Sequence, residues 1–140
     1  MTVVLVLLAA GCTGPVRSHG VYASKAANTA AKTASAVATA ELTVRAVTRD
    51  RTFGRTAAQT LAESAEDASS TQGIFDAIQP PDRRSDRLRS ELDDLLERAV
   101  GTLEDLRTAA RRGDVAGLER AAAPLPELAG DLDDFAEAHR

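Results

Sequence analysis

The sequence is poor in the residues from which most catalytic and cofactor sites are built. Its 140 residues include one cysteine, one methionine, two histidines and no tryptophan. A single cysteine cannot close an intramolecular disulfide, so packing alone must hold the fold together. The histidines are His19, in a stretch expected to be a linker, and His139, the penultimate residue. No serine, threonine or cysteine nucleophile is therefore expected to have a base beside it.

The common metal and cofactor motifs are missing as well. Neither histidine has the Glu-x-x-His spacing of carboxylate di-metal bundles, and there is no Cys-x-x-Cys-His haem motif or glycine-rich phosphate loop. Acidic pairs such as Glu91 and Asp94 could hold a hard cation weakly, but solvated surface carboxylates are the simpler interpretation. We therefore predict that the protein is not an enzyme and uses no cofactor.

Nucleic acid is disfavoured as a partner, because the net charge is −4 and only 3% of the residues are aromatic. The charge is unevenly distributed, since residues 13–60 carry a net charge of +5 and residues 61–140 a net charge of −9. The basic third could lie against anionic lipid headgroups. The interpretation that we favour is a basic helix that packs among acidic helices of the same chain.

The most specific motif lies at the N-terminus. Residues 3–10 form an uncharged apolar run that is too short to cross a membrane as a helix, and the run leads into Leu8-Ala9-Ala10-Gly11-Cys12. Small residues let an extended backbone lie close to a peptidase, as a cleavage site requires. The thiol of Cys12 can accept a diacylglycerol through a thioether bond. The alternative is an ordinary buried cysteine next to an apolar terminus.

This segment resembles the signal peptides of bacterial lipoproteins, whose lipobox usually reads Leu-(Ala/Ser)-(Gly/Ala)-Cys. The resemblance implies that a signal peptidase recognises Leu8, Ala9, Ala10 and Gly11, and that Cys12 is lipidated and becomes the mature N-terminus. Ala9 stands where the usual pattern has leucine, and no basic residue precedes the apolar run. A translation start upstream of Met1 would account for the missing basic residues. Fifteen arginines against two lysines are typical of a high-GC genome, such as that of an actinobacterium.

We predict three parts in the chain: a lipoprotein signal peptide at residues 1–11, the lipidated cysteine with a flexible tether at residues 12–21, and a helical domain at residues 22–140. The tether is rich in glycine and polar residues and spans at most about 30 Å when extended. The expected location is the extracytoplasmic face of the cell membrane, with the N-terminal lipid as the membrane contact.

Composition favours helices, because alanine is abundant and the β-branched and aromatic runs of sheet proteins are missing. Apolar residues recur in steps of three and four in four segments, at residues 22–51, 56–78, 82–112 and 115–138. The predicted core stripes are Ala26, Ala30, Thr33, Val37, Ala40, Val44 and Val47; Ala57, Leu61, Ala65, Ala68, Gln72, Phe75 and Ile78; Leu88, Leu92, Leu95, Ala99, Leu103, Leu106 and Ala110, flanked by Leu96 and Val100; and Val115, Leu118, Ala122, Leu125, Leu128, Leu132 and Phe135. Hydroxyl residues beside the first stripe, such as Ser35 and Thr39, are interpreted as a solvated flank rather than a ligand site.

Turn signals separate the first three segments. Gly54 suits the end of the first helix, and Thr56 with Gln59 has capping-box spacing for the start of the second. The run Gln79-Pro80-Pro81-Asp82 ends the second helix, because a residue before proline is pushed out of the helical region. Either Pro81 or Asp82 can then open the third helix.

Two further signals concern the fourth segment. Arg112-Gly113-Asp114 spells the integrin-binding tripeptide, but it also supplies the glycine and the aspartate that a helix junction needs, and we favour the junction. Pro124 and Pro126 fall inside the fourth apolar stripe, which continues through them. This combination predicts a kink within one helix.

Comparable segment lengths and short links predict an all-α fold, an up-and-down antiparallel four-helix bundle whose fourth helix is kinked at the prolines. The predicted function is that of a membrane-anchored extracytoplasmic lipoprotein with a non-enzymatic structural or interaction role toward an unknown protein partner. The alternative is a carrier that holds a small apolar or lipid-like ligand in the bundle interior near Phe75, Ile78, Leu88 and Phe135.

Overall fold

The computed structural model describes residues 16–50 and 54–140. Within these ranges all regular secondary structure is helical and no strand is present. The helices are α1 (His19–Asp50), α2 (Arg55–Asp76), α3 (Arg83–Arg112), α4 (Val115–Ala122) and α5 (Leu125–Ala138). The prediction of an all-α fold is therefore confirmed.

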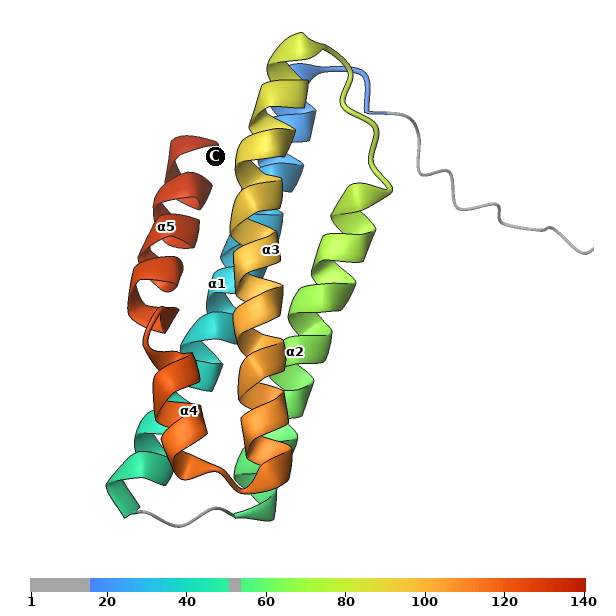
Figure 1. Ribbon diagram of the computed structural model, residues 1–140. Helices are drawn as coiled ribbons and strands as arrows, with labels where there is room; N and C mark the ends of the chain where they lie inside the picture. The colour runs from blue at the N-terminus through green and yellow to red at the C-terminus, as the bar shows by residue number, and fades with distance from the viewer. Residues whose placement is uncertain (1–15, 51–53) are drawn as a thin grey trace, which may run out of the picture.

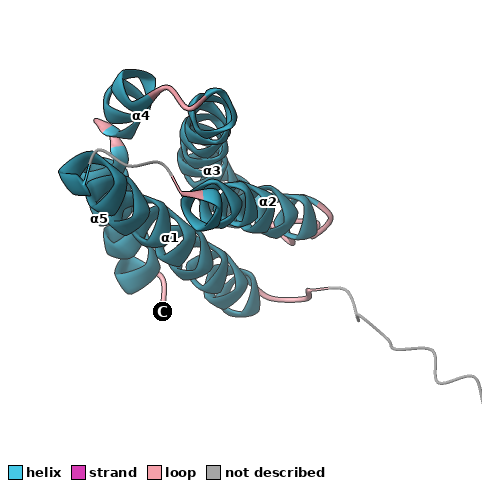
Figure 2. Ribbon diagram, turned by 90° about the horizontal axis from the view of Figure 1, so that it is seen from below, coloured by secondary structure: helices cyan, strands magenta, loops and turns pink. Residues whose placement is uncertain are grey.

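The helices are arranged in four columns. Figure 1 shows α1, α2 and α3 alongside one another, while α4 and α5 follow each other along a fourth column. In the view along the helices (Figure 2), α1 lies next to both α2 and α5, and α3 lies next to α2 and α4, in agreement with the helix pairs that make contact. This arrangement creates a single interior toward which each column turns its apolar stripe.

The first helix contributes small side chains to this interior. Every residue of its predicted stripe is buried, including Thr33, whose hydroxyl donates to the Thr29 carbonyl at 3.1 Å and is thereby satisfied. The helix begins at His19, before the predicted start at Tyr22. Tyr22 is fully buried against Phe75, so its burial holds the first turn of the helix in place.

The start of α2 differs from the prediction. Arg55 is the first helical residue and Gly54 is the N-cap, so Gly54 precedes a helix instead of ending one. No side chain caps this end, and the Gln59 amide donates to Glu63 rather than back to the helix start. The predicted capping box is wrong because the N-cap is Gly54, two residues before Thr56, which places Thr56 inside the first turn.

The predicted stripe of α2 otherwise faces the interior. Leu61, Ala65, Ala68 and Phe75 are buried, whereas the flanking members of the stripe, including Gln72, are half-buried. The polar Gln72 thus lies at the margin of the interior, where its amide retains access to solvent.

The third helix starts and packs largely as predicted. The Asp82 carboxylate is its N-cap and accepts a hydrogen bond from the Ser85 backbone N–H at 2.8 Å. One detail of the predicted stripe is reversed: Leu96 is fully buried, whereas Leu95 is only half-buried. Residues 88, 92, 96, 99, 103, 106 and 110 keep one line of helical spacing along the core side, and Leu95 falls to its edge.

The tripeptide Arg112-Gly113-Asp114 forms a helix junction, as predicted. Gly113 has φ 65° in the left-handed region, which favours glycine, and its N–H donates to the Ala110 carbonyl at 3.1 Å. Asp114 then caps α4 by accepting a hydrogen bond from the Gly117 N–H at 2.8 Å. The tripeptide is therefore explained by its place in the turn between α3 and α4.

The prolines divide the predicted fourth helix into two. α4 ends at Ala122 and α5 begins at Leu125, with Ala123 and Pro124 between them in helical backbone conformation. Both prolines lack the N–H that would have continued the hydrogen-bond ladder. Burial nevertheless continues from Leu118 in α4 to the apolar residues of α5, so the two helices act as one column toward the interior.

The Asp114 cap leads to a prediction about two glycines. Gly101 has open space around its Cα, so Gly101→Ala is expected to raise the free energy of unfolding by about 1 kcal/mol. A Cβ on Gly117 would clash with the Asp114 carboxylate, so Gly117→Ala must displace the cap. The loss of the cap costs about 1 kcal/mol and removes the gain. Urea denaturation of both variants measures the difference, and an equal gain from both would contradict the cap geometry.

Candidate functional site

The residues with the clearest functional signal lie outside the described part of the chain. These are Leu8, Ala9, Ala10, Gly11 and Cys12. The described residues begin close to this motif: Val16 packs against the core, and α1 begins seven residues after Cys12. Among the described helices, none has the length and apolar composition needed to cross a bilayer.

One contact between a histidine and a serine was not foreseen from the sequence. The Nδ1 atom of His19 lies 3.0 Å from the Ser85 hydroxyl oxygen, although the two residues are 66 positions apart. Ser85 has no exposed surface, and its backbone N–H is bound by Asp82. A substrate cannot reach this hydroxyl, so the geometry is that of a tie between the first turns of α1 and α3.

Asp82 belongs to the same corner. The hydrogen bond from the Ser85 backbone N–H lowers the pKa of Asp82, and His19 nearby acts in the same direction. The carboxylate is therefore stabilised as the charged helix cap, which is also the charge favoured at a helix N-terminus. In a catalytic triad the carboxylate would orient the imidazole, whereas here it binds a backbone N–H.

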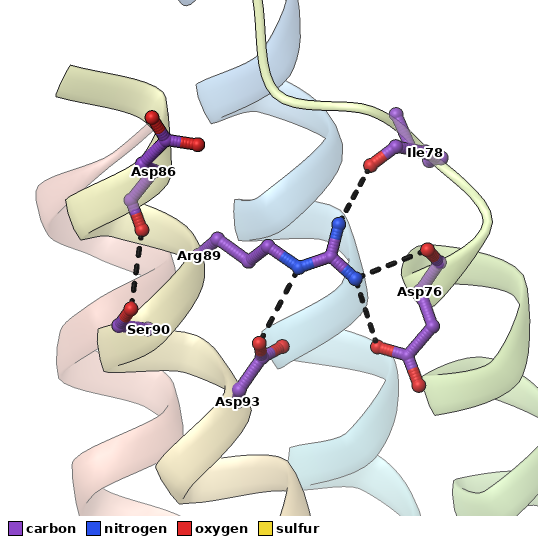
Figure 3. A network of polar contacts seen from close by, with 6 residues as sticks. All are labelled: Asp76, Ile78, Asp86, Arg89, Ser90 and Asp93. Atoms are coloured by element: carbon purple, nitrogen blue, oxygen red, sulfur yellow. Dashed lines mark hydrogen bonds and ion pairs between the residues drawn. The ribbon is translucent and has the colours of Figure 1, made fainter. Parts of the chain in front are cut away.

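The most extensive polar network surrounds Arg89, at the corner between α2 and α3 (Figure 3). Its guanidinium donates to the backbone carbonyls of Ile78 and Asp76, each at 3.0 Å. It also forms ion pairs with the carboxylates of Asp76 at 3.5 Å and Asp93 at 3.4 Å. The Arg89 side chain is only 23% exposed and fixes the end of α2.

Two buried polar atoms near this network lack a hydrogen-bond partner among the described residues, namely the Tyr22 hydroxyl and Asp93 Oδ1. The Tyr22 ring is fully buried, with its centroid 5.5 Å from that of Phe75. Burial raises the pKa of Tyr22, and burial likewise raises the pKa of Asp93 despite the opposing charge of Arg89. The network thus holds a carboxylate that is less well solvated than a surface aspartate.

The two aspartates predict opposite pH dependences. Above the ordinary aspartate pKa and up to the raised native pKa of Asp93, the folded state binds more protons than the unfolded state, so the stability contributed by Asp93 falls as the pH rises. The lowered pKa of Asp82 makes its contribution fall as the pH drops through the acidic range. As the pH rises from about 3 to about 6, the free energy of unfolding of Asp93→Asn should increase relative to that of the wild type. That of Asp82→Asn should decrease relative to the wild type over the same range. Urea denaturation across this range measures both trends, and parallel trends would contradict the assignment.

A surface groove with a volume of about 430 Å³ runs between α1 and α2. We call it the α1–α2 groove, and its lining residues are Lys32, Ser35, Ala36 and Thr39 from α1 and Thr60, Glu63, Ser64, Asp67, Ser70 and Thr71 from α2. The hydroxyl residues that were interpreted as a solvated flank of α1 therefore line one side of a groove. The sequence showed the hydroxyls of each helix but not that the two sets face each other.

The residues of the predicted carrier site do not form a described opening. Phe75, Leu88 and Phe135 are buried, Ile78 is half-buried, and none of the four lines the described grooves. His139, close to this end, lies with its ring centroid 4.5 Å from that of Phe135. Within the described ranges, no group of three or more histidine, cysteine or acidic residues could hold a metal ion.

Comparison with known proteins assigns no relative: no family model matches the chain, and no curated protein or solved structure matches it either. The functional argument therefore rests on the residues themselves. They offer an N-terminal motif, a corner stabilised by charged hydrogen bonds, and a groove between two helices.

Proposed function

We propose that this protein is a lipid-anchored helical domain at the extracytoplasmic face of the cell membrane, with a non-enzymatic structural or interaction role. The observation that carries the proposal is the run Leu8-Ala9-Ala10-Gly11-Cys12, which ends an apolar segment in the only cysteine of the chain. The short distance in sequence from Cys12 to α1 supports it, since a domain on such a tether stays close to the bilayer.

We further propose that the domain is an up-and-down antiparallel four-helix bundle in which α4 and α5 together serve as the fourth helix, bent at the prolines. The two described connections, from α2 to α3 and from α3 to α4, lie at opposite ends of the molecule in Figure 1, which supports this topology. Such a bundle presents long helix faces, which are suited to contact with another protein.

The described polar groups favour structural roles over catalysis. His19 and Ser85 join two helices in a place that substrate cannot enter, and Arg89 binds carbonyls at the end of α2. The α1–α2 groove, by contrast, is open to solvent and lies on one side of the domain. We therefore place the proposed interaction on the helix surface rather than in the interior.

Replacing Cys12 with serine tests the anchoring. The variant keeps the size and polarity of the residue but cannot form the thioether, so the protein is expected to leave the membrane fraction. The precursor that accumulates when lipoprotein signal peptidase is inhibited with globomycin should disappear as well. Thr13→Ala is the matched control and should remain in the membrane fraction. If Cys12→Ser stays in the membrane fraction to the same extent as the wild type, the lipoprotein assignment fails.

A further inference from the structure

The outer face formed by α1 and α2 carries all three large hydrophobic residues that are strongly exposed within the described ranges. Val21, Leu42 and Ile74 are 51%, 66% and 68% exposed, respectively. Helical spacing aligns them with the α1–α2 groove, because Val21 precedes Lys32 by eleven residues, Leu42 follows Ser35 by seven and Ile74 follows Asp67 by seven. Val21 and Ile74 lie near one end of this face, beside the Tyr22–Phe75 contact, whereas Leu42 lies 21 residues further along α1. They therefore offer separate apolar contacts toward the two ends of a face that is otherwise polar.

The floor of the groove allows another helix to approach closely. Ala36 presents only a methyl group, and the hydroxyls of Ser35 and Thr39 already donate to carbonyls of their own helix at 3.0 and 2.9 Å. A partner that covers Ser35 and Thr39 therefore leaves neither of these two hydroxyl donors without an acceptor. The two helices lie side by side in both views, so the face is two helices wide (Figures 1 and 2).

The charges on this face form two columns of opposite sign, one on each helix. Lys25 and Lys32 are exposed on α1, whereas Glu63 and Asp67 are exposed on α2. No ion pair joins the lysines to these acidic residues within the described part of the chain, although Lys32, Glu63 and Asp67 line the same groove. A partner that brings an acidic helix to α1 and a basic helix to α2 would match both columns.

We propose that this partner is a second copy of the chain, which forms a two-fold symmetric dimer through the α1–α2 face. A two-fold axis parallel to the helices places α1 of each copy over α2 of the other, so that the Lys32 ammonium meets the acidic pair twice. Val21 and Ile74 lie at the same height, because their neighbours Tyr22 and Phe75 are in ring contact. The same axis therefore also brings Val21 of each copy against Ile74 of the other.

The expected size of this interface fits a dimer. The shared length is set by the 22 residues of α2, which extend for about 33 Å, and two helices are about 20 Å wide. The face therefore covers about 650 Å² on each copy, close to the roughly 800 Å² that a stable interface buries on each partner.

The dimer rests on the proposed interaction role and specifies its partner. Its geometry is also compatible with the proposed lipid anchor. An axis parallel to the helices leaves the N-terminal ends of both α1 helices at the same end of the dimer, so both tethers can reach one bilayer. Attachment to the same membrane raises the effective concentration of the copies and favours a weak contact. The contact itself needs no lipid, so it can be measured on the Cys12→Ser chain separately from anchoring.

Charge reversal of the two columns tests the proposal. In the Cys12→Ser background, sedimentation velocity should show a concentration-dependent dimer. The pairs Lys25→Glu with Lys32→Glu and Glu63→Lys with Asp67→Lys should each weaken it by about tenfold or more, because like charges then face each other. All four side chains are exposed, and circular dichroism verifies that both variants stay folded. An equimolar mixture of the two variants should restore a dimer that contains one copy of each.

Disulfide trapping locates the contact. Because the Cys12→Ser chain has no cysteine, Thr39→Cys places a single thiol in the groove near the proposed axis, and oxidation should link two copies. Ser90→Cys, exposed on α3, is the matched control: it should still dimerise but should form no disulfide between copies. A Cys12→Ser chain that remains monomeric at all concentrations, a mixture that does not recombine, or cross-linking through Ser90→Cys in place of Thr39→Cys would each overturn the proposal.

Discussion

Replacing Leu96 with alanine is expected to lower the free energy of unfolding by about 3 kcal/mol, the middle of the range for a buried leucine. Leu96 has no exposed surface and lies on the core side of α3, which contacts α1, α2, α4 and α5. Truncation removes its buried apolar area and leaves a cavity that packed helices fill only in part. Urea denaturation monitored by circular dichroism at 222 nm measures the loss.

The adjacent Leu95→Ala is the control. Leu95 is half-buried at the edge of the same helix face, so its truncation is expected to cost about 1 kcal/mol. The two substitutions are chemically identical, which makes the comparison independent of helix propensity. Hydrophobic periodicity alone assigned Leu95 to the core stripe and Leu96 to the flank. A larger loss from Leu95→Ala than from Leu96→Ala would support that assignment and contradict the packing of α3.

Replacing Arg89 with methionine is expected to destabilise the fold by about 2 kcal/mol, the range of a charge-assisted hydrogen bond that is lost from a partly buried site. Methionine keeps the length and apolar stem of the side chain but cannot donate to the carbonyls of Ile78 and Asp76. It also leaves Asp93, whose pKa burial already raises, without its cation. We expect the end of α2 to open first, and amide hydrogen exchange of residues 74–78 should accelerate.

Two variants isolate the contribution of the guanidinium. Arg87→Met removes an exposed arginine from the same turn of α3 and is expected to change the stability by less than about 0.5 kcal/mol. Adding Asp93→Asn to Arg89→Met should recover part of the loss, because the carboxylate that lost its partner is then neutral. If Arg87→Met and Arg89→Met are equally destabilising, or if the double variant recovers nothing, the network in Figure 3 does not stabilise the corner as described.

The corner around Arg89 also shows which polar contacts can be predicted from sequence patterns and which cannot. Asp114 could be identified as a helix cap, and Asp82 as one of two candidates for the start of α3, because a cap binds a backbone N–H three residues away and the signal is local. The contact of Ser85 with His19 and the contacts of Arg89 with the end of α2 could not be predicted in this way. Their partners lie on other helices or beyond the helix end, and their distances depend on how the helices pack.

The α1–α2 groove depends on packing in the same way. Ser35 and Thr39 could be placed on the polar side of the first helix from helical spacing, which correctly separated them from the buried stripe. Spacing within one helix cannot indicate which other helix lies beside that side. Their juxtaposition with Glu63 and Asp67, and with it the opposed charge columns of the proposed dimer, follows only from the contact of α1 with α2.

The sequence by itself determined the all-helical class, the core stripe of α1 and the junction at Gly113, because each depends on helical periodicity or on backbone conformation within a few residues. It also contains the motif at Leu8 to Cys12, which is read as a linear segment. The tertiary structure decided that Leu96 rather than Leu95 is buried and that Arg89 fixes the end of α2. These outcomes depend on the rotation and contact of whole helices, whose energies are set by neighbours distant in the chain.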